Sequence, residues 1–332
     1  MPIAASQGMF PQRAVQWFNK NAVDLRLVRP LSLGAAHHQK VLVIDDKLAF
    51  CAGGDISVDR WDTCEHLDLD IHRVMPTGQS VRPRHEVIMM VDGDAALSLG
   101  DLARAGWEWV TGETLTPIEV DYDPWPQDVT PTLTDAEVGI SRTISGASGT
   151  EEAREVEALF LDMIAGAERL IFLENQYFTS PVVATAIAER LAEPDGPEVV
   201  LVSTGESPSW FDHATMDGAR AEVLATLKKA DVHGRMTAWH PKTKGGENII
   251  VHSKVTIIDD RMLRVGSSNL NNRSCGYDTE CDVTVEREKA DPAIRGVRQY
   301  LLAHFLGVTE AAFAAAEADA GTVAGAIQAL ND

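Results

Sequence analysis

A motif of about ten residues occurs twice in this chain, and the repeat limits the folds that the chain can adopt. The stretch HHQKVLVIDD, residues 37–46, returns as VHSKVTIIDD, residues 251–260. Each copy contains His-x-Lys, four further residues and Asp. When His38 is aligned with His252, most following positions are identical or similar, and Asp55 falls on Asn269. A similarity of this length indicates two homologous halves, so we expect them to form a pseudo-dimer.

The two halves differ in what precedes the motif. Only 37 residues precede His38 in the first copy, whereas a much longer stretch separates the first copy from His252 in the second. The segment Leu115–Gly139 is rich in proline and acidic residues, which interrupt periodic structure. We therefore place the boundary at residue 145, with a first half over 1–145 and a second half over 146–332. The first half is expected to be incomplete at its N-terminus.

The second half alternates between helical and strand-like patterns. EEAREVEALFLDMIAGAERL, VATAIAERLAE and MDGARAEVLATLKKA have apolar residues at helical spacing, and LIFLENQYF, EVVLVST and GRMTAWHP read as strands. An Ala-rich pair of helices is expected at the C-terminus. Alternation of this kind predicts an α/β fold, here two α-β-α sandwich halves with a largely buried sheet.

Composition excludes several classes of function. The chain of 332 residues has a formal net charge of −21, which disfavours nucleic acid as a partner because phosphate neutralisation needs clustered Lys and Arg. Its cysteines form no C-x-x-C pair and predict reduced thiols in the cytoplasm; they are Cys51, Cys64, Cys275 and Cys281. No apolar run is long enough to span a membrane, so we expect any membrane contact to be peripheral.

The chemistry of the motif points to phosphate. Side chains two positions apart on a strand share a face, so His38 and Lys40 lie together, as do His252 and Lys254. The aspartates of the two motifs, Asp45 and Asp259, fall on the opposite face and are assigned a structural role. A neighbouring ammonium group opposes metal binding, so neither a metal nor another cofactor is expected at the motifs.

Two histidines suit a two-step transfer. One imidazole attacks phosphorus and forms a phosphohistidine, while the other protonates the leaving alcohol and then activates the acceptor. The lysines stabilise the charge on the non-bridging oxygens. A single copy of the motif cannot act as nucleophile and general acid at once, which explains why the motif is duplicated.

These residues resemble the phospholipase D superfamily, whose mark is a duplicated H-x-K-x4-D motif. The resemblance extends to GGDIS, RWDT, ENQYF, GSSNLNNRS and DTECD, and covers residues 25–305. ENQYF and RWDT favour the branch of bacterial phospholipases D and cardiolipin synthase-like proteins over the nuclease branch. The resemblance implies a phosphodiesterase or transphosphatidylase that acts on phospholipid without a metal.

The resemblance also implies roles for individual residues. His38 would be the nucleophile and His252 the general acid and base, with Lys40, Lys254 and Asn269 holding the phosphate. Glu280 of DTECD would orient His252. Asp70 would orient His38, with Asp68 as the alternative. Possible pocket residues are Asp55, His85 of RPRHEV (where Arg84 replaces the family's Trp), and Glu174, Asn175 and Gln176 of ENQYF.

We expect from this a phospholipase D-type enzyme that splits a glycerophospholipid into phosphatidic acid and a head-group alcohol. Three alternatives stay open: phosphatidyl transfer of the cardiolipin-synthase type, a nuclease or other phosphodiesterase of the same superfamily, and a non-catalytic lipid-binding remnant. The expected partner is phospholipid at a membrane surface. The sequence leaves head-group specificity and oligomeric state open.

Overall fold

The computed structural model describes residues 18–20, 23–28, 34–146, 151–206 and 216–331. An eight-stranded sheet dominates the fold, in the order β6-β5-β13-β12-β11-β7-β8-β9. Its strands are β5 (Glu137–Ile144), β6 (Ala153–Arg154), β7 (Leu170–Glu174), β8 (Glu198–Val202), β9 (Met236–Trp239), β11 (Val255–Ile258), β12 (Met262–Gly266) and β13 (Glu280–Glu286).

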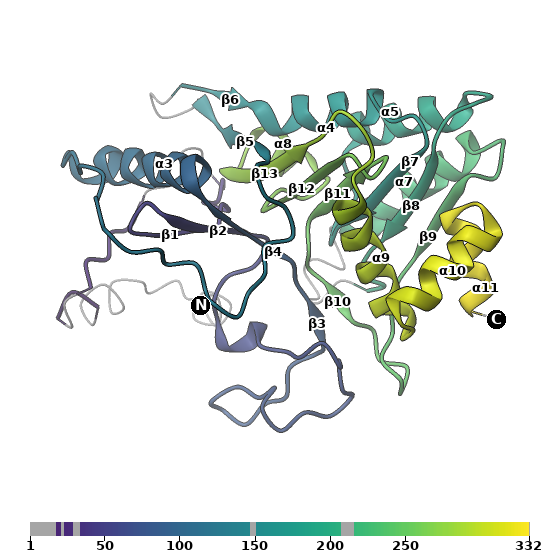
Figure 1. Ribbon diagram of the computed structural model, residues 1–332, viewed down its shortest axis with the longest axis horizontal. Helices are drawn as coiled ribbons and strands as arrows, with labels where there is room; N and C mark the ends of the chain where they lie inside the picture. The colour runs from purple at the N-terminus through teal and green to yellow at the C-terminus, as the bar shows by residue number, and fades with distance from the viewer. Residues whose placement is uncertain (1–17, 21–22, 29–33, 147–150, 207–215, 332) are drawn as a thin grey trace.

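Helices cover both faces of this sheet (Figure 1). Side chains alternate along β7, so that Ile171 and Leu173 pack with one helix layer and Leu170 and Phe172 with the other. One layer contains α4 (Glu155–Ala165), α5 (Pro181–Ala192) and α7 (Gly218–Ala230), and the other α9 (Pro292–Leu306), α10 (Glu310–Ala320) and α11 (Val323–Asn331). The predicted α-β-α sandwich is therefore confirmed, including the C-terminal helix pair.

A smaller sheet carries the first motif, in the order β1-β2-β4. Its elements are β1 (Val41–Ile44), β2 (Leu48–Ala52) and β4 (Ile88–Asp92), followed by α3 (Gly93–Thr111). The remaining short elements are η1 (Val58–Arg60), β3 (Arg84–His85), β10 (Ile250–Val251) and α8 (Asn272–Gly276). The segment between β2 and β3 forms a lobe of residues 53–83 at the bottom of Figure 1.

The two motif hairpins have the same register. Val41 pairs with Cys51 in the first hairpin, and Val255 pairs with Val265 in the second. Both turns contain two consecutive aspartates with φ between 51° and 55°, which the short side chain of Asp tolerates. The helix α3 follows β4 as α9 follows β13. The repeat in the sequence is thus a repeat in structure.

The halves are unequal in the structure as well. Before β1, residues 34–40 form no helix or strand that would correspond to α4 or β7. The strand β5 precedes the predicted boundary at residue 145, yet it pairs with β13 from Glu137 to Thr143 and so belongs to the large sheet. The boundary itself stays a prediction.

No single helix among the described residues is long and apolar enough to cross a membrane. Within the described ranges, α9 and α10 are the one pair of helices that together have the required length and composition, and they meet at an angle of 104°.

Candidate active site

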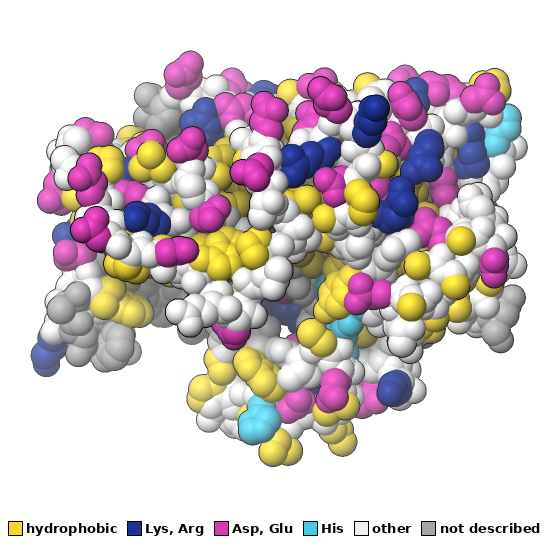
Figure 2. All heavy atoms as spheres, viewed as in Figure 1, with side chains coloured by type: hydrophobic (Ala, Val, Ile, Leu, Met, Phe, Trp, Pro, Cys, Tyr) yellow, Lys and Arg dark blue, Asp and Glu magenta, His cyan; other side chains and the backbone are white. Residues whose placement is uncertain are grey.

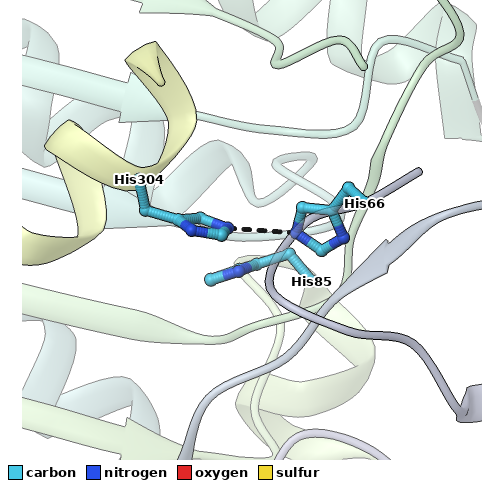
Figure 3. Close-up of side chains that lie close together, drawn as sticks. All are labelled: His66, His85 and His304. Atoms are coloured by element: carbon cyan, nitrogen blue, oxygen red, sulfur yellow. Dashed lines mark hydrogen bonds between the residues drawn. The ribbon is translucent and has the colours of Figure 1, made fainter. Parts of the chain in front are cut away.

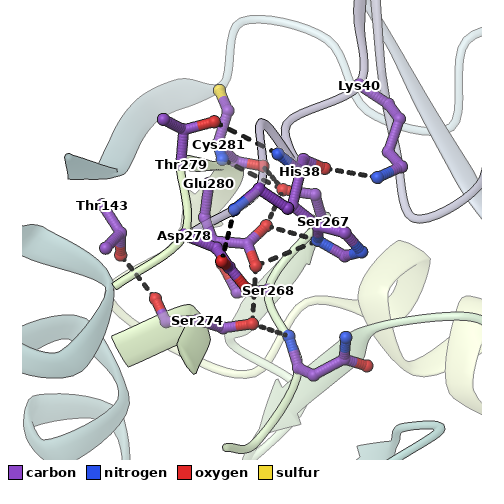
Figure 4. A network of polar contacts seen from close by, with 12 residues as sticks. His38, Lys40, Thr143, Ser267, Ser268, Ser274, Asp278, Thr279, Glu280 and Cys281 are labelled. Atoms are coloured by element: carbon purple, nitrogen blue, oxygen red, sulfur yellow. Dashed lines mark hydrogen bonds and ion pairs between the residues drawn. The ribbon is translucent and has the colours of Figure 1, made fainter. Parts of the chain in front are cut away.

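The first motif histidine is held by a glutamate of the other half. His38 Nδ1 lies 2.9 Å from Glu280 Oε2, and its backbone N–H donates to Thr279 O at 3.0 Å (Figure 4). Because an ionised carboxylate only accepts hydrogen bonds, the ring proton lies on Nδ1 and the lone pair on Nε2. Nε2 of His38 is thus available to attack or to accept a proton.

The second motif histidine is held in the same way. His252 Nδ1 lies 2.8 Å from Glu86 Oε2, and its backbone N–H donates to His85 O at 2.9 Å. Glu86 directly follows β3, which pairs in parallel with β10 immediately before His252. Each half therefore supplies the carboxylate that orients the other half's imidazole.

Two of the predicted partnerships are wrong. Glu280 orients His38 and not His252, because β13 begins beside the chain that enters β1. Asp70 does not contact His38; its side chain accepts the N–H of His72 within its own loop. The alternative, Asp68, accepts hydrogen bonds from Thr243 and from the Gly245 N–H. Both aspartates belong to the lobe of residues 53–83, away from the motif.

Glu86 was missed by the sequence reasoning. Strand pairing reveals its equivalence to Glu280: β2 Ala52 pairs with Ile88, and β12 Gly266 pairs with Asp282. Glu86 lies two positions before Ile88, and Glu280 lies two positions before Asp282, so the two glutamates have equivalent places beside their hairpins. A comparison of EVIMMVD with ECDVTVE would have found this, but the lobe of residues 53–83 breaks the constant offset of the repeat.

The two carboxylates differ in their surroundings. Glu280 accepts hydrogen bonds from the hydroxyls of Ser267 and Ser274, both at 2.5 Å. Gly53 occupies the place equivalent to Ser267, and a Cβ there would lie 2.7 Å from Lys254 Cδ. Among the described residues no serine donates to Glu86, and burial raises its pKa, although Lys254 opposes the shift. The site therefore combines a fully hydrogen-bonded carboxylate and a poorly solvated one.

The motif lysines lie beside their histidines, as predicted. Lys254 Nζ donates to His252 O and Lys40 Nζ to His38 O, both at 2.5 Å. Burial lowers the pKa of both ammonium groups. The charge of Lys40 contributes to the shift of Lys254, so the two motifs converge on one site.

Positive charge is concentrated around His252. Burial holds the pKa of His252 well below its usual range, and Lys254, Arg84 and Arg60 disfavour the imidazolium further. Arg84 is buried, and its Nε and Nη1 have no hydrogen-bond partner among the described residues. Buried N–H groups without partners are costly, which is a reason to expect an anionic ligand here.

The other predicted pocket residues have mixed surroundings. Glu174 is fully buried and contacts His85 Nε2 at 3.1 Å and the Ser253 hydroxyl at 2.6 Å. Asn175 accepts the backbone N–H of Tyr177 and Leu270 and so ties two loops together. Through these contacts Glu174 and Asn175 hold neighbouring residues of the site in place.

Three further predicted residues lie at different depths. Asn269 is buried with its Oδ1 unpaired among the described residues, whereas Asp55 is exposed, 3.9 Å from Lys40 Nζ. Gln176 is buried and donates to the Tyr177 hydroxyl.

The motif aspartates have contacts that fit the predicted structural role. Asp259 accepts the backbone N–H of Glu168, Arg169 and Leu170 at 2.7–2.8 Å and so fixes the start of β7. Asp45 accepts a hydrogen bond from the Tyr122 hydroxyl.

A cavity of about 1350 Å³ adjoins the site along β4. Its apolar lining includes Met89, Val91, Leu133, Leu263 and Leu301, and Arg60, Arg84 and Glu86 border it. Neither motif histidine lines it. Figure 2 shows this face hollowed beside a gathering of hydrophobic side chains, with acidic side chains spread over the surrounding surface. An apolar cavity next to buried cations suits an amphipathic anion.

Comparison with known proteins agrees with this geometry. Residues 160–301 match a family model described as a cardiolipin synthase, phospholipase D-like domain. Cardiolipin synthase A of Pseudomonas entomophila is 27% identical over 83% of this chain and 47% of its own length. The same protein of Pseudomonas aeruginosa is 25% identical over 80% of this chain. The chain spans about half the length of these curated relatives.

A solved structure shows the same fold. Phosphatidylserine synthase of Haemophilus influenzae superposes with a TM-score of 0.50 at 15% identity, over 80% of this chain and 60% of that chain. The duplicated motif, the sandwich fold and the matching domain model agree: residues 160–301 match a phospholipase D-like domain, and the chain as a whole is similar to proteins of the phospholipase D superfamily.

Proposed function

We propose that this protein transfers a phosphatidyl group from one phospholipid to an alcohol, in the manner of a cardiolipin synthase. The observation that carries the proposal is the pair of carboxylate-oriented imidazoles, His38 with Glu280 and His252 with Glu86. The names of the curated relatives support transfer over the hydrolysis that the sequence favoured.

The reaction would proceed in two displacements. His38 Nε2 attacks the phosphorus, and His252 protonates the departing head-group alcohol, leaving the phosphatidyl group bound to His38. His252, now neutral, takes the proton of the incoming alcohol, whose oxygen displaces His38 from phosphorus. Water as the acceptor would give phosphatidic acid by the same route.

The electrostatics of the site support this sequence of steps. In the substrate-free protein, burial and Lys254 hold the pKa of His252 low. A bound phosphodiester carries a negative charge, and a nearby negative charge favours the imidazolium form. Substrate would therefore help to protonate the group that acts as general acid.

Two features support a lipid substrate in particular. Arg84 and Arg60 border both the site and the apolar cavity, so a head group and an acyl chain would find suitable surfaces side by side. The net charge of −21 disfavours a nucleic-acid substrate.

The test is a transfer assay on the purified chain. Vesicles of phosphatidylglycerol, with and without butanol, are incubated with the wild type and with His38→Ala and His252→Ala, and the lipids are identified by mass spectrometry. We expect cardiolipin without butanol and phosphatidylbutanol with it, both lost in each variant. Phosphatidic acid as the sole product under both conditions would establish hydrolysis and overturn the transfer proposal.

A further inference from the structure

Three histidines converge outside the motif site. His66 comes from the lobe of residues 53–83, His85 from β3 and His304 from α9, and one ring nitrogen of each lies within 4.8 Å of the others (Figure 3). His66 Nε2 is 3.0 Å from His304 Nε2. Because the three residues come from distant segments, the cluster could not be recognised from a metal-ligand spacing in the sequence.

We propose that His66, His85 and His304 bind one zinc ion. Imidazole nitrogens lie about 2.0–2.1 Å from zinc, so two ligands of a tetrahedral site are about 3.3 Å apart. The observed separation between His66 and His304 is close to that value. The ring centroids of the three pairs lie 5.0, 5.4 and 6.2 Å apart, so the three rings surround one common point closely enough to share an ion.

Carboxylates occupy the second nitrogen of two of the rings. His66 Nδ1 lies 2.9 Å from Asp62 Oδ2, and His85 Nε2 lies 3.1 Å from Glu174 Oε2. Histidines that ligate metals usually donate their other N–H to such a group, which fixes the tautomer and makes the free nitrogen a better ligand. The two carboxylates also balance the charge of a divalent cation. Asp62 is itself held by Arg73 and by the Arg84 N–H.

The cluster is buried but not closed. His66 and His85 are each 7% exposed, and all three histidines line the cavity along β4. A water molecule from the cavity can therefore take the fourth position. Three nitrogen ligands with a water molecule form a set that zinc accepts.

The position of the cluster gives the ion a structural role. It would fasten the lobe of residues 53–83 to β3 and α9. The carbonyl of His85 accepts the His252 N–H, and Glu86 is the next residue. Zinc would thus hold the carboxylate that orients His252 without touching the reacting atoms.

The test measures metal binding directly. The full chain is stripped of metal, and Zn²⁺ is titrated against a chromogenic chelator, with stoichiometry checked by elemental analysis. Co²⁺ is bound in parallel to read coordination from its visible absorption spectrum. We expect one ion per chain, tetrahedral Co²⁺ bands and a raised melting temperature. His304→Ala should weaken binding at least tenfold, and His72→Ala, which removes an exposed histidine of the same lobe, should not.

The following results would contradict the proposed zinc site. Binding at many weak sites, or affinity that is equal in His304→Ala and His72→Ala, would show adventitious binding to surface groups. If His304→Ala fails to fold, the wild-type Co²⁺ spectrum decides alone, because octahedral bands exclude a three-histidine tetrahedral site. None of these readouts depends on phosphatidyl transfer, so the zinc site can fail while the proposed function stands.

Discussion

At the scale of single residues, the exchange of glutamates between halves is the feature that organises the site. The Nδ1 atoms of His38 and His252 each contact a carboxylate of the other half; Glu280 begins β13, and Glu86 directly follows β3. The histidines and lysines could be found from the sequence because they recur in one short motif. Which glutamate reaches which ring could not be found, because strand pairing between distant segments decides it: Glu280 was recognised but assigned to the wrong histidine.

The role of Glu86 can be tested by replacing it with glutamine. Glu86→Gln keeps the shape but removes the charge that fixes the His252 tautomer, so transfer should fall by roughly 10²- to 10⁴-fold. Initial rates of phosphatidylbutanol formation measure the effect. Asp70→Asn is the matched control and should retain wild-type rates. Equal losses in both variants would restore the partnership that the sequence suggested.

The charge state of His252 can be followed by proton NMR. Because burial and Lys254 disfavour the imidazolium, the His252 ring should titrate below the usual range of histidine. Inorganic phosphate should raise the midpoint, since an anion near the ring favours its charged form. The spectrum of His252→Asn assigns the resonance. A midpoint in the ordinary histidine range, insensitive to phosphate, would contradict the described electrostatics.

At the scale of elements, the strands and helices of the second half could be predicted better than the way in which they pair. The strand-helix alternation of the second half was predictable, because buried strands such as EVVLV and amphipathic helices have distinct periodicities. The inclusion of β5 in the large sheet was not, because its pairing with β13 joins distant segments.

The two motif aspartates provide a matched comparison of stability. Both have a positive φ, 54° at Asp259 and 51° at Asp45, so the backbone strain of an alanine should be similar in each. Asp259→Ala also leaves three backbone N–H groups without an acceptor. It should therefore lower the free energy of unfolding by about 2–4 kcal/mol more than Asp45→Ala does. Urea denaturation of both variants measures the difference, and equal losses would show that the N–H groups find other acceptors.

At the scale of the whole molecule, the two motif hairpins are related by a repeat, but the elements around them are not. The hairpins, their turns and their cross-paired histidines repeat, whereas the large sheet and most of the helices belong to residues 137–331. The cavity along β4 lies between these two parts and next to Arg84. We propose that this cavity binds an acyl chain of the substrate.

Filling this cavity should change the preference for acyl-chain length. Leu133→Trp places a bulky ring in the lining, so rates on long-chain phosphatidylglycerol should fall several-fold more than rates on a short-chain, micellar analogue. Leu69→Trp adds the same ring at a site that is 88% exposed and serves as the control. An equal loss on both substrates would place the acyl chain elsewhere.

The proposed transfer requires a phosphatidyl group bound to His38, and this intermediate can be trapped. A phosphatidyl donor with a nitrophenol leaving group needs no general acid, so His252→Ala should form the adduct and resolve it slowly. The sample is quenched at alkaline pH, and its peptides are sequenced by mass spectrometry. We expect the adduct on His38 in His252→Ala and no adduct in His38→Ala. An adduct on His252 would reverse the assigned roles, and release of nitrophenol with no adduct on either histidine would contradict the mechanism.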